Sequence, residues 1–239
     1  MATSSPVLGI IGAGQLAQMT LAPAASLGIT LKILAASAQD SAAQYFPASV
    51  GDYSNLDQLL NFAELCDVIT FEHELVPNGH LRRLEELGHV IRPSSKALLH
   101  AQDKAHMRSS FQSVGIAQPR WKVISTAEEI DAFPVILKSI SGGYDGRGVR
   151  RINNQGEAQD LLTLWGSALC EELIPFDREL SIMIARSPHN QVATWVLTET
   201  VQRDGICIET ISPAPHFDDS LAFKAQEIAE RIAAHIQLV

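Results

Sequence analysis

The chain has 239 residues, of which 46% are hydrophobic and 19% are charged, and its formal net charge at pH 7 is −9. The apolar content suffices for a buried core, whereas the negative charge excludes a general attraction to nucleic acid or to an anionic membrane. No apolar run reaches the roughly 18 residues of a membrane-spanning helix, and the first residues lack a signal-peptide pattern. We therefore expect a globular cytoplasmic protein without nucleic-acid or membrane partners.

The first hundred residues alternate short β-type runs with helical patterns. Strands are expected at 7–11, 31–34, 68–71 and 90–91, and helices at 15–26, 55–65 and 79–87, the second of them capped by Asp52 or Ser54. This alternation is typical of a parallel sheet with crossover helices, which predicts a small Rossmann-like unit. A helix over 96–114 follows.

Beyond this helix the order of the elements changes. Strands are expected at 121–124, 134–138, 149–152 and 168–172, and helices after Ser125 or Thr126 and at 157–165. Three further β-type runs, at 180–185, 194–202 and 206–211, are separated by turn signals and predict an antiparallel sheet. An amphipathic helix over 221–236 is the last expected element.

The turn after the first strand reads Gly12-Ala13-Gly14-Gln15-Leu16-Ala17 and opens a helix. In this setting backbone N–H groups and the helix dipole can hold a phosphate. A dinucleotide-binding enzyme carries an acid at the end of its second strand, but this chain has Leu34-Ala35-Ala36-Ser37 there, which disfavours a nicotinamide or flavin site. A phosphate site for another ligand is the favoured interpretation, and helix packing against the strand is the alternative.

A second glycine-rich segment, Ser141 to Gly148, follows a predicted strand that carries Lys138. Its sequence, Ser-Gly-Gly-Tyr-Asp-Gly-Arg-Gly, lets the backbone close over phosphates, and a lysine on the strand can reach phosphate oxygens. It is not a Walker A loop, because no Gly-Lys-Ser/Thr opens a helix. We expect a flap over the phosphates of ATP; a glycine-rich hairpin turn is the alternative.

An acidic segment follows some twenty residues later, with Glu171 and Glu172 at the end of a predicted strand and Glu179 shortly after. A carboxylate and the backbone at a strand end can bind the adenine edge, and a second carboxylate can bind the ribose hydroxyls. A solvated acidic turn is the alternative interpretation.

Together these motifs resemble the ATP-grasp superfamily and, within it, the N5-carboxyaminoimidazole ribonucleotide synthetases, the ATPase subunit of phosphoribosylaminoimidazole carboxylase. The resemblance is carried by Gly12-Ala-Gly-Gln-Leu, Val68-Ile-Thr-Phe-Glu-His-Glu, Ala101-Gln-Asp-Lys, Gly142-Gly-Tyr-Asp-Gly-Arg-Gly and Glu171 through Ser181. It implies an α/β fold with an N-terminal Rossmann-like (pre-ATP-grasp) parallel sheet at 1–101, an ATP-grasp lid at 102–177, and the first half of an ATP-grasp body at 178–239. The implied reaction makes carboxyphosphate from ATP and bicarbonate and carboxylates aminoimidazole ribonucleotide in de novo purine biosynthesis.

The resemblance also implies roles for individual residues. The ribonucleotide would contact Gly14, Gln15, Leu16 and Glu72, and the positions expected at the carboxyphosphate and the amine are Tyr144, Asp145 and Arg147. The positions expected to bind ATP are Lys104, Lys138, Gly143, Tyr144, Asp145, Gly146, Arg147, Gly148, Val149, Glu171, Glu172, Leu173, Ile174, Glu179 and Gln202. The family commonly has His where this chain has Gln202, which departs from the pattern.

The family binds Mg²⁺ through residues on strands that would follow Val239, so the chain resembles a C-terminally truncated member. No metal ligand is expected within this chain, the Mg²⁺ ligands are expected beyond Val239, and the segment alone is expected to be inactive. The family is usually dimeric, which makes a homodimer the expected assembly.

Three other interpretations remain open from the sequence. The first is another purine-pathway ATP-grasp enzyme, such as the formate-using glycinamide ribonucleotide transformylase. The second is a non-catalytic nucleotide-binding or assembly protein. The third and most distant is a dinucleotide oxidoreductase.

Overall fold

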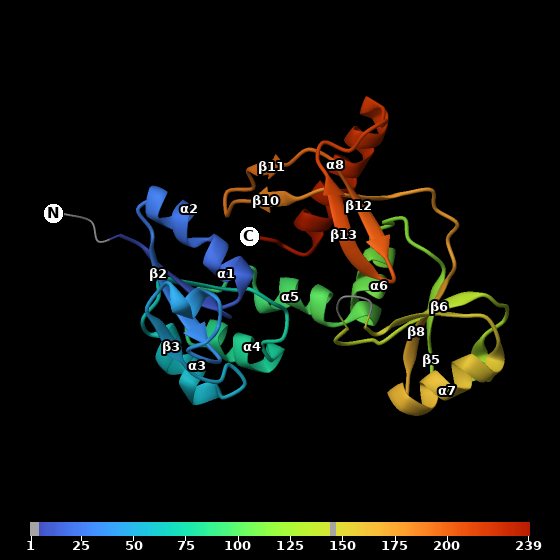
Figure 1. Cartoon of the computed structure of the whole chain (residues 1–239), viewed down its shortest axis with the longest axis horizontal. Helices are drawn as coiled ribbons and strands as arrows, with labels where there is room; N and C mark the ends of the chain where they lie inside the picture. The colour runs from blue at the N-terminus through green and yellow to red at the C-terminus, as the bar shows by residue number, and fades with distance from the viewer. Residues whose placement is uncertain (1–4, 144–146) are drawn as a thin grey trace. The chain divides into compact units, whose positions relative to one another are not determined.

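The computed structural model describes residues 5–143 and 147–239, and the chain divides into two compact units, Met1–Leu98 and Leu99–Val239. Strands and helices alternate along the first unit, and antiparallel strands dominate the second (Figure 1). The predicted α/β class is confirmed. The finer boundary between residues 177 and 178 lies inside the second unit and stays a prediction.

The first unit is built on a parallel sheet with the strand order β3-β2-β1-β4. Its strands are β1 (Val7–Ile11), β2 (Thr30–Ala35), β3 (Ala48–Val50) and β4 (Val68–Phe71). β3 was not predicted, because Ala-Ser-Val is too short and too weakly apolar to stand out from a loop. The strand predicted at 90–91 is reduced to an isolated parallel bridge between Ile69 and Ile91.

Helices cover both faces of this sheet. The helices are α1 (Gln15–Met19), α2 (Leu21–Ser26), α3 (Leu56–Ala63) and α4 (Asn78–Glu86), with a short 3-10 turn η1 (Ala42–Gln44). Ile10 of β1 packs with Ala17 and Ala24, whereas Ile11 packs with Leu59 and Leu84. Since successive strand residues point to opposite faces, α1 and α2 cover one face and α3 and α4 cover the other.

The helix predicted over 15–26 is interrupted at Thr20, which separates α1 from α2. The N-cap of α3 is Asn55, whose side chain accepts a hydrogen bond from the N–H of Gln58, so the predicted caps Asp52 and Ser54 are wrong. An asparagine at this position satisfies one of the N–H groups that a helix start leaves without an intrahelical partner.

The helix predicted over 96–114 is two helices, α5 (Ser95–Gln102) and α6 (Lys104–Ser113). Asp103 separates them, because its backbone is extended and its carboxylate accepts a hydrogen bond of 2.8 Å from the N–H of His106. Asp103 is therefore the N-cap of α6. The cap thus sets the start of α6 at Lys104.

The second unit contains an antiparallel sheet with the order β5-β8-β6-β7, which we call the lid sheet because it lies within the segment predicted to be the lid. Its strands are β5 (Trp121–Ile124), β6 (Val135–Lys138), β7 (Val149–Ile152) and β8 (Ala168–Glu172), each within one residue of the prediction. α7 (Gln155–Trp165) covers one face, and its Leu162 packs with Leu137 and Cys170. The helix predicted after Ser125 or Thr126 is only the 3-10 turn η2 (Ala127–Glu129).

The remaining strands form two small antiparallel sheets, β13-β12-β9 and β10-β11. The elements are β9 (Glu179–Ser181), β10 (Ile184–Arg186), β11 (Val192–Thr194), β12 (Thr198–Arg203), β13 (Ile206–Ile211) and the helix α8 (Asp219–His235). Two of the three predicted strands are thus broken into two. The predicted turn between β12 and β13 is present, with positive φ at Asp204 (52°) and Gly205 (78°). In the part of the chain that the structure describes, no helix is both long and apolar enough to cross a membrane.

Candidate functional site

The two described ends of the glycine-rich segment meet next to β6. The N–H of Ser139 donates to the carbonyl oxygen of Gly148 at 2.8 Å. Gly143 and Gly148 have φ values of 83° and 77°, and a Cβ on Gly143 would lie 2.6 Å from the carbonyl oxygen of Arg147. Both the backbone conformation and the close approach therefore require glycine at these positions.

The residues predicted at the centre of this segment, Tyr144, Asp145 and Gly146, lie outside the described residues. Their predicted catalytic and cofactor roles stay predictions. Arg147, which follows them, is exposed, and Val149 begins β7.

Lys104 lies beside the start of the glycine-rich segment. Its Nζ donates to the carbonyl oxygen of Gly142 at 2.6 Å, and its backbone N–H donates to the carbonyl oxygen of Ile140 at 2.9 Å. Asp103 and Ser141 form a β-bridge at the same place. The start of α6 is therefore attached to this segment by both backbone and side chain, and the phosphate role of Lys104 stays a prediction.

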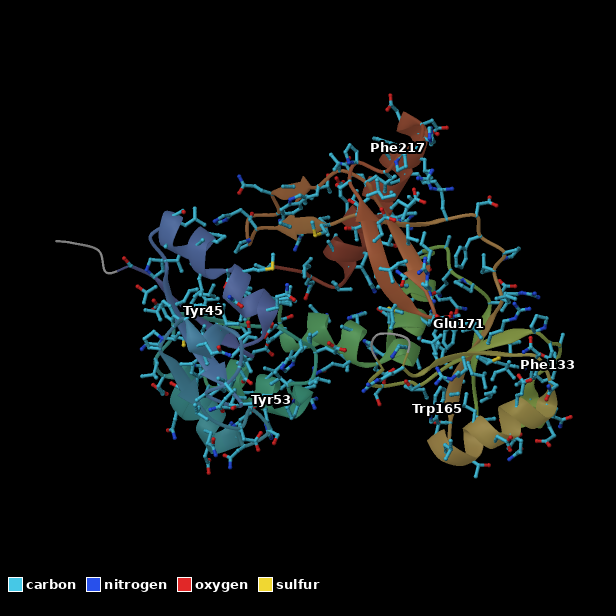
Figure 2. The ribbon with its side chains drawn as sticks, viewed as in Figure 1. Tyr45, Tyr53, Phe133, Trp165, Glu171 and Phe217 are labelled. Carbon is cyan, nitrogen blue, oxygen red and sulfur yellow. The ribbon has the colours of Figure 1, made fainter. Side chains whose placement is uncertain are left out.

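Lys138 and Glu171 lie on the face of the lid sheet that α7 does not cover. Leu137 and Cys170 are opposite each other in the β6–β8 pair and pack with α7, so their neighbours Lys138 and Glu171 point to the other face. The Nζ of Lys138 lies 2.8 Å from Oε2 of Glu171. Figure 2 shows Glu171 among the lid strands and Trp165 on α7.

Glu171 has a second cationic partner, Arg108 of α6. The Nε of Arg108 donates to Oε1 of Glu171 at 2.7 Å, and the Glu171 side chain is only 4% exposed. Burial raises the pKa of Glu171, but the hydrogen bonds and charges of Arg108 and Lys138 outweigh it and hold the pKa below its ordinary range. The carboxylate is thus ionised and shared by two cations; we call these three residues the Arg108–Glu171–Lys138 cluster.

Arg108 was not predicted from the sequence, although one signal for it is present. Arg108 lies four residues after Lys104 on α6, and residues at this spacing share one face of a helix. Lys104 is a predicted phosphate ligand, so a second cation on its face of the helix indicates a residue of the same site.

Glu172, predicted beside Glu171 at the adenine edge, faces the other way. Its Oε1 accepts from the backbone N–H of Arg120 at 2.8 Å and its Oε2 from the Nε of Arg120 at 2.7 Å. The hydrogen bonds from Arg120 hold the pKa of Glu172 below its usual range. The strand therefore presents only the Glu171 carboxylate beside Lys138, and Leu173 and Ile174 continue the chain from β8.

A cavity of about 540 Å³ brings together three of the residues predicted to bind ATP. Val149, Glu179 and Gln202 all line it, next to Phe176 and Glu199. Gln202 stands at an irregularity of the β12–β13 pair, where the register shifts after Val201. These three residues, predicted from separate parts of the sequence, thus line one cavity within the second unit.

A second cavity, of about 430 Å³, is lined by Lys122, Phe133, Cys170, Glu172 and their neighbours, including Glu171. Lys122 is opposite Cys170 in the β5–β8 pair and so lies on the face that α7 covers. Lys138, Lys104 and the glycine-rich segment are not among the lining residues. This cavity is therefore not the predicted phosphate site.

In the first unit the glycine turn surrounds the carboxylate of Glu72. Oε2 of Glu72 accepts the N–H of Gly14 at 2.6 Å, and Oε1 accepts the N–H groups of Leu16 at 2.9 Å and Ala17 at 3.3 Å. A Cβ on Gly14 would lie 2.6 Å from the same carboxylate. The group that accepts from the N–H groups of the turn in this structure is therefore a side chain of the chain itself, and the phosphate site stays a prediction.

The structure nevertheless brings together the residues predicted to contact the ribonucleotide, which are Gly14, Gln15, Leu16 and Glu72. Gln15 and Leu16 are exposed.

Within residues 5–143 and 147–239, no group of three His, Cys, Asp or Glu side chains is placed to hold a metal ion.

Comparisons with known proteins cover nearly the whole chain. A family model described as "ATP-grasp domain" matches residues 109–239, and one described as "Ribonucleotide synthetase preATP-grasp domain" matches residues 6–102. The chain is 42% identical over 246 residues to the N5-carboxyaminoimidazole ribonucleotide synthase of Mycobacterium tuberculosis, with 98% of this chain and 57% of that protein covered.

Two solved structures from Aspergillus clavatus are similar to the chain. The carboxyaminoimidazole ribonucleotide synthase complexed with ATP has a TM-score of 0.88 at 28% identity, covering 97% of this chain and 63% of that one. The complex with ADP and 5-aminoimidazole ribonucleotide has a TM-score of 0.87 at 26% identity, with the same coverage. The chain spans less than two thirds of the length of each of these relatives. With the ATP-grasp model matching residues 109–239, the chain belongs to the ATP-grasp family.

Proposed function

We propose that the chain provides the nucleotide-binding part of an ATP- and bicarbonate-dependent ligase that carboxylates 5-aminoimidazole ribonucleotide to N5-carboxyaminoimidazole ribonucleotide in purine biosynthesis. The observation that carries the proposal is the position of Lys138 against the buried Glu171, beside a glycine-rich segment, in an ATP-grasp chain. The names of the similar proteins support the choice of substrate.

In the proposed site Lys138 and Lys104 bind the phosphates of ATP, and Gly143 to Val149 cover them. The lysines supply positive charge, and the glycines let backbone N–H groups approach the phosphate oxygens. Glu171 and the backbone from Glu172 to Ile174 form the adenine edge. Glu179 and Gln202, which line the cavity of about 540 Å³, bind the ribose side of the nucleotide.

The proposed chemistry has two steps. A bicarbonate oxygen attacks the γ-phosphorus of ATP, so that ADP leaves and carboxyphosphate forms. The exocyclic amine of the ribonucleotide then attacks the carboxyl carbon, inorganic phosphate leaves and the amine loses a proton. Tyr144, Asp145 and Arg147 are proposed to position the carboxyphosphate and the amine. An anionic, hydrolysable intermediate needs cations to bind it and a cover that excludes water.

Glu72 is proposed to accept a hydrogen bond from the amine of the ribonucleotide, next to Gly14, Gln15 and Leu16. Three backbone N–H groups fix this carboxylate in one position, and Oε2, which accepts one of the three, keeps a second lone pair. The acceptor is therefore oriented before the substrate arrives, which lowers the cost of binding.

We further propose that Mg²⁺ accompanies ATP, that the protein acts in the cytoplasm, and that it forms a homodimer. Mg²⁺ would neutralise charge on the transferred phosphoryl group. The described residues offer no group of three His, Cys, Asp or Glu side chains placed to hold the ion.

Calorimetric titration of the chain with ATP and with NAD tests the nucleotide assignment. ATP should bind, and Lys138→Ala should weaken ATP binding about tenfold or more, because a phosphate contact to a full charge is lost. Lys122→Ala is the matched control, since Lys122 lies on the face of the same sheet that α7 covers and pairs with Asp131. Binding of NAD without binding of ATP would contradict the proposal.

Titration with 5-aminoimidazole ribonucleotide and, separately, with glycinamide ribonucleotide tests the substrate. The first should bind more tightly, and Glu72→Ala should abolish the difference. Preference for glycinamide ribonucleotide would instead identify another purine-pathway ATP-grasp enzyme, and binding of neither would leave a nucleotide-binding protein without this substrate.

A further inference from the structure

In the proposed function two anionic groups compete for Lys138, the phosphate of the nucleotide and the carboxylate of Glu171. To bind a phosphate, its ammonium group must turn toward the nucleotide, but it now forms an ion pair of 2.8 Å with Glu171, whose side chain is 4% exposed. If Lys138 were the only partner of Glu171, each phosphate contact would leave a buried carboxylate without a counter-ion. Such a group is among the most costly to leave unpaired in a protein.

Arg108 provides Glu171 with a second counter-ion. Its Nε donates to Oε1 of Glu171 at 2.7 Å, while Lys138 contacts the other oxygen, Oε2. The two cations thus use separate oxygens, and either can leave without breaking the bond of the other. We propose that Arg108 is a positioning residue of the nucleotide site, which retains the Glu171 carboxylate so that Lys138 can move to the phosphates.

The charge and exposure of the three side chains agree with this division of roles. With one carboxylate and two cations the Arg108–Glu171–Lys138 cluster carries one excess positive charge, whereas Glu171 and Lys138 alone would be neutral. Lys138 is the more exposed cation, at 25% against 15% for Arg108. The ammonium group on its flexible stem is therefore the partner that moves, and the guanidinium group is the one that stays.

The main chain around Arg108 holds it in place. Arg108 lies within α6, whose start is fixed by the Asp103 cap and by the bonds of Lys104 to the glycine-rich segment. The side chain of Gln118 donates to the carbonyl oxygen of Arg108 at 2.8 Å. α6 thus links the position of Arg108 to the same segment that is proposed to cover the phosphates.

Nucleotide affinities test the inference, which rests on the proposed function. Arg108→Met should weaken ATP binding about tenfold or more, since one full charge near the phosphates is lost. Adenosine, which carries no phosphate, should change by less than about threefold. Arg108→Lys should restore part of the loss, and Lys122→Met, which removes a charge from the face covered by α7, should leave both affinities unchanged. Equal losses for ATP and adenosine would overturn the inference.

A double variant separates positioning from simple structural support. In Arg108→Met/Glu171→Gln no carboxylate remains to hold Lys138, so ATP should bind more tightly than to Arg108→Met alone. If Arg108 only supported the fold, the second substitution would add to the loss instead, and that outcome would refute the proposal.

The reactivity of Lys138 gives a measurement that needs no nucleotide. In Arg108→Met the Glu171 carboxylate pairs with Lys138 alone, so it holds the Lys138 Nζ more tightly and acylation of Lys138 by acetic anhydride slows about threefold or more. An unchanged or faster acylation rate would overturn the inference even if ATP binds. Conversely, failure of the wild-type chain to bind ATP would refute the proposed function, and the acylation rate would still decide whether Arg108 controls Lys138.

Discussion

Gly9 of β1 lies directly against the side chains of Phe62 and Cys66 in the first unit. A Cβ at this position would contact Sγ of Cys66 and would lie 3.1 Å from Cε1 of Phe62. Gly9→Ala should therefore lower the free energy of unfolding by about 1–3 kcal/mol, as overpacking of a core does. Urea denaturation of the wild type and the variant measures this difference in unfolding free energy.

Two variants control the Gly9 experiment. Gly79→Ala should not lower the stability, because a Cβ there meets no atom within 4 Å. Cys66→Ala combined with Gly9→Ala should recover part of the loss, since the closest clashing atom is removed. A Gly9→Ala chain as stable as the wild type would contradict the close packing of Gly9 against Phe62 and Cys66.

Glu171 should make the stability of the chain depend on pH in the acid range. Its pKa in the folded chain lies below the ordinary value of 4.5, because the bonds from Arg108 and Lys138 outweigh the effect of burial. Its contribution is complete above the unfolded-state pKa and is lost as the pH falls through the lower folded-state pKa.

The comparison of wild type with Glu171→Gln measures this contribution. The difference in unfolding free energy, from urea denaturation, should be constant near neutral pH and should shrink as the pH falls below about 4.5. A difference that grows on acidification would mean that Glu171 is not stabilised as an anion.

Among the elements, α7 begins with a side-chain cap that can be tested alone. Asn154 has an extended backbone, and its Oδ1 accepts the N–H of Glu157 at 3.0 Å. Asn154→Ala should lower the free energy of unfolding by about 1 kcal/mol, whereas Asn154→Ser should keep most of it, since serine caps equally well. Equal effects of the two substitutions in urea denaturation would argue against the cap.

The elements also show what the sequence could predict. The strands of the lid sheet were predicted to within one residue, because glycines, prolines and short polar runs bound the β-type segments. The helix predicted over 96–114 was too long, because Asp103 interrupts an otherwise continuous helical pattern with a cap whose geometry the sequence does not reveal. β3 was missed because it is held by its parallel pairing with β2 rather than by its own composition.

The candidate site was predictable where a motif is local and unpredictable where it is not. Lys138 and the glycines are close in sequence, and their proximity follows from β6 and β7 being paired. The contact of Arg108 with Glu171 joins residues 63 positions apart, and that of Gly14 with Glu72 joins residues 58 apart. Such contacts depend on the packing of whole elements, which no local pattern encodes.

At the scale of the whole molecule, the two compact units should respond differently to nucleotide. ADP should slow hydrogen exchange in the second unit, at the amides of α6, β6 and β8, because the proposed phosphate and adenine contacts belong to these elements. The amides of β1 and β2 should change little.

Mass spectrometry of exchange with and without ADP measures this response, and Lys138→Ala is the control in which the protection should be weaker at the same ADP concentration. Protection that is greatest in β1 and β2 would place the nucleotide in the first unit and contradict the assignment.

The carboxylate of Glu72 determines which ligands the Rossmann-like turn can accept. Because it is attached to the same fold, it is present at the turn at an effective concentration of about millimolar or more, and a soluble pyrophosphate would have to displace it from three N–H groups. Redesign of this unit into a dinucleotide receptor would therefore begin with the removal of Glu72, before any change to the glycines.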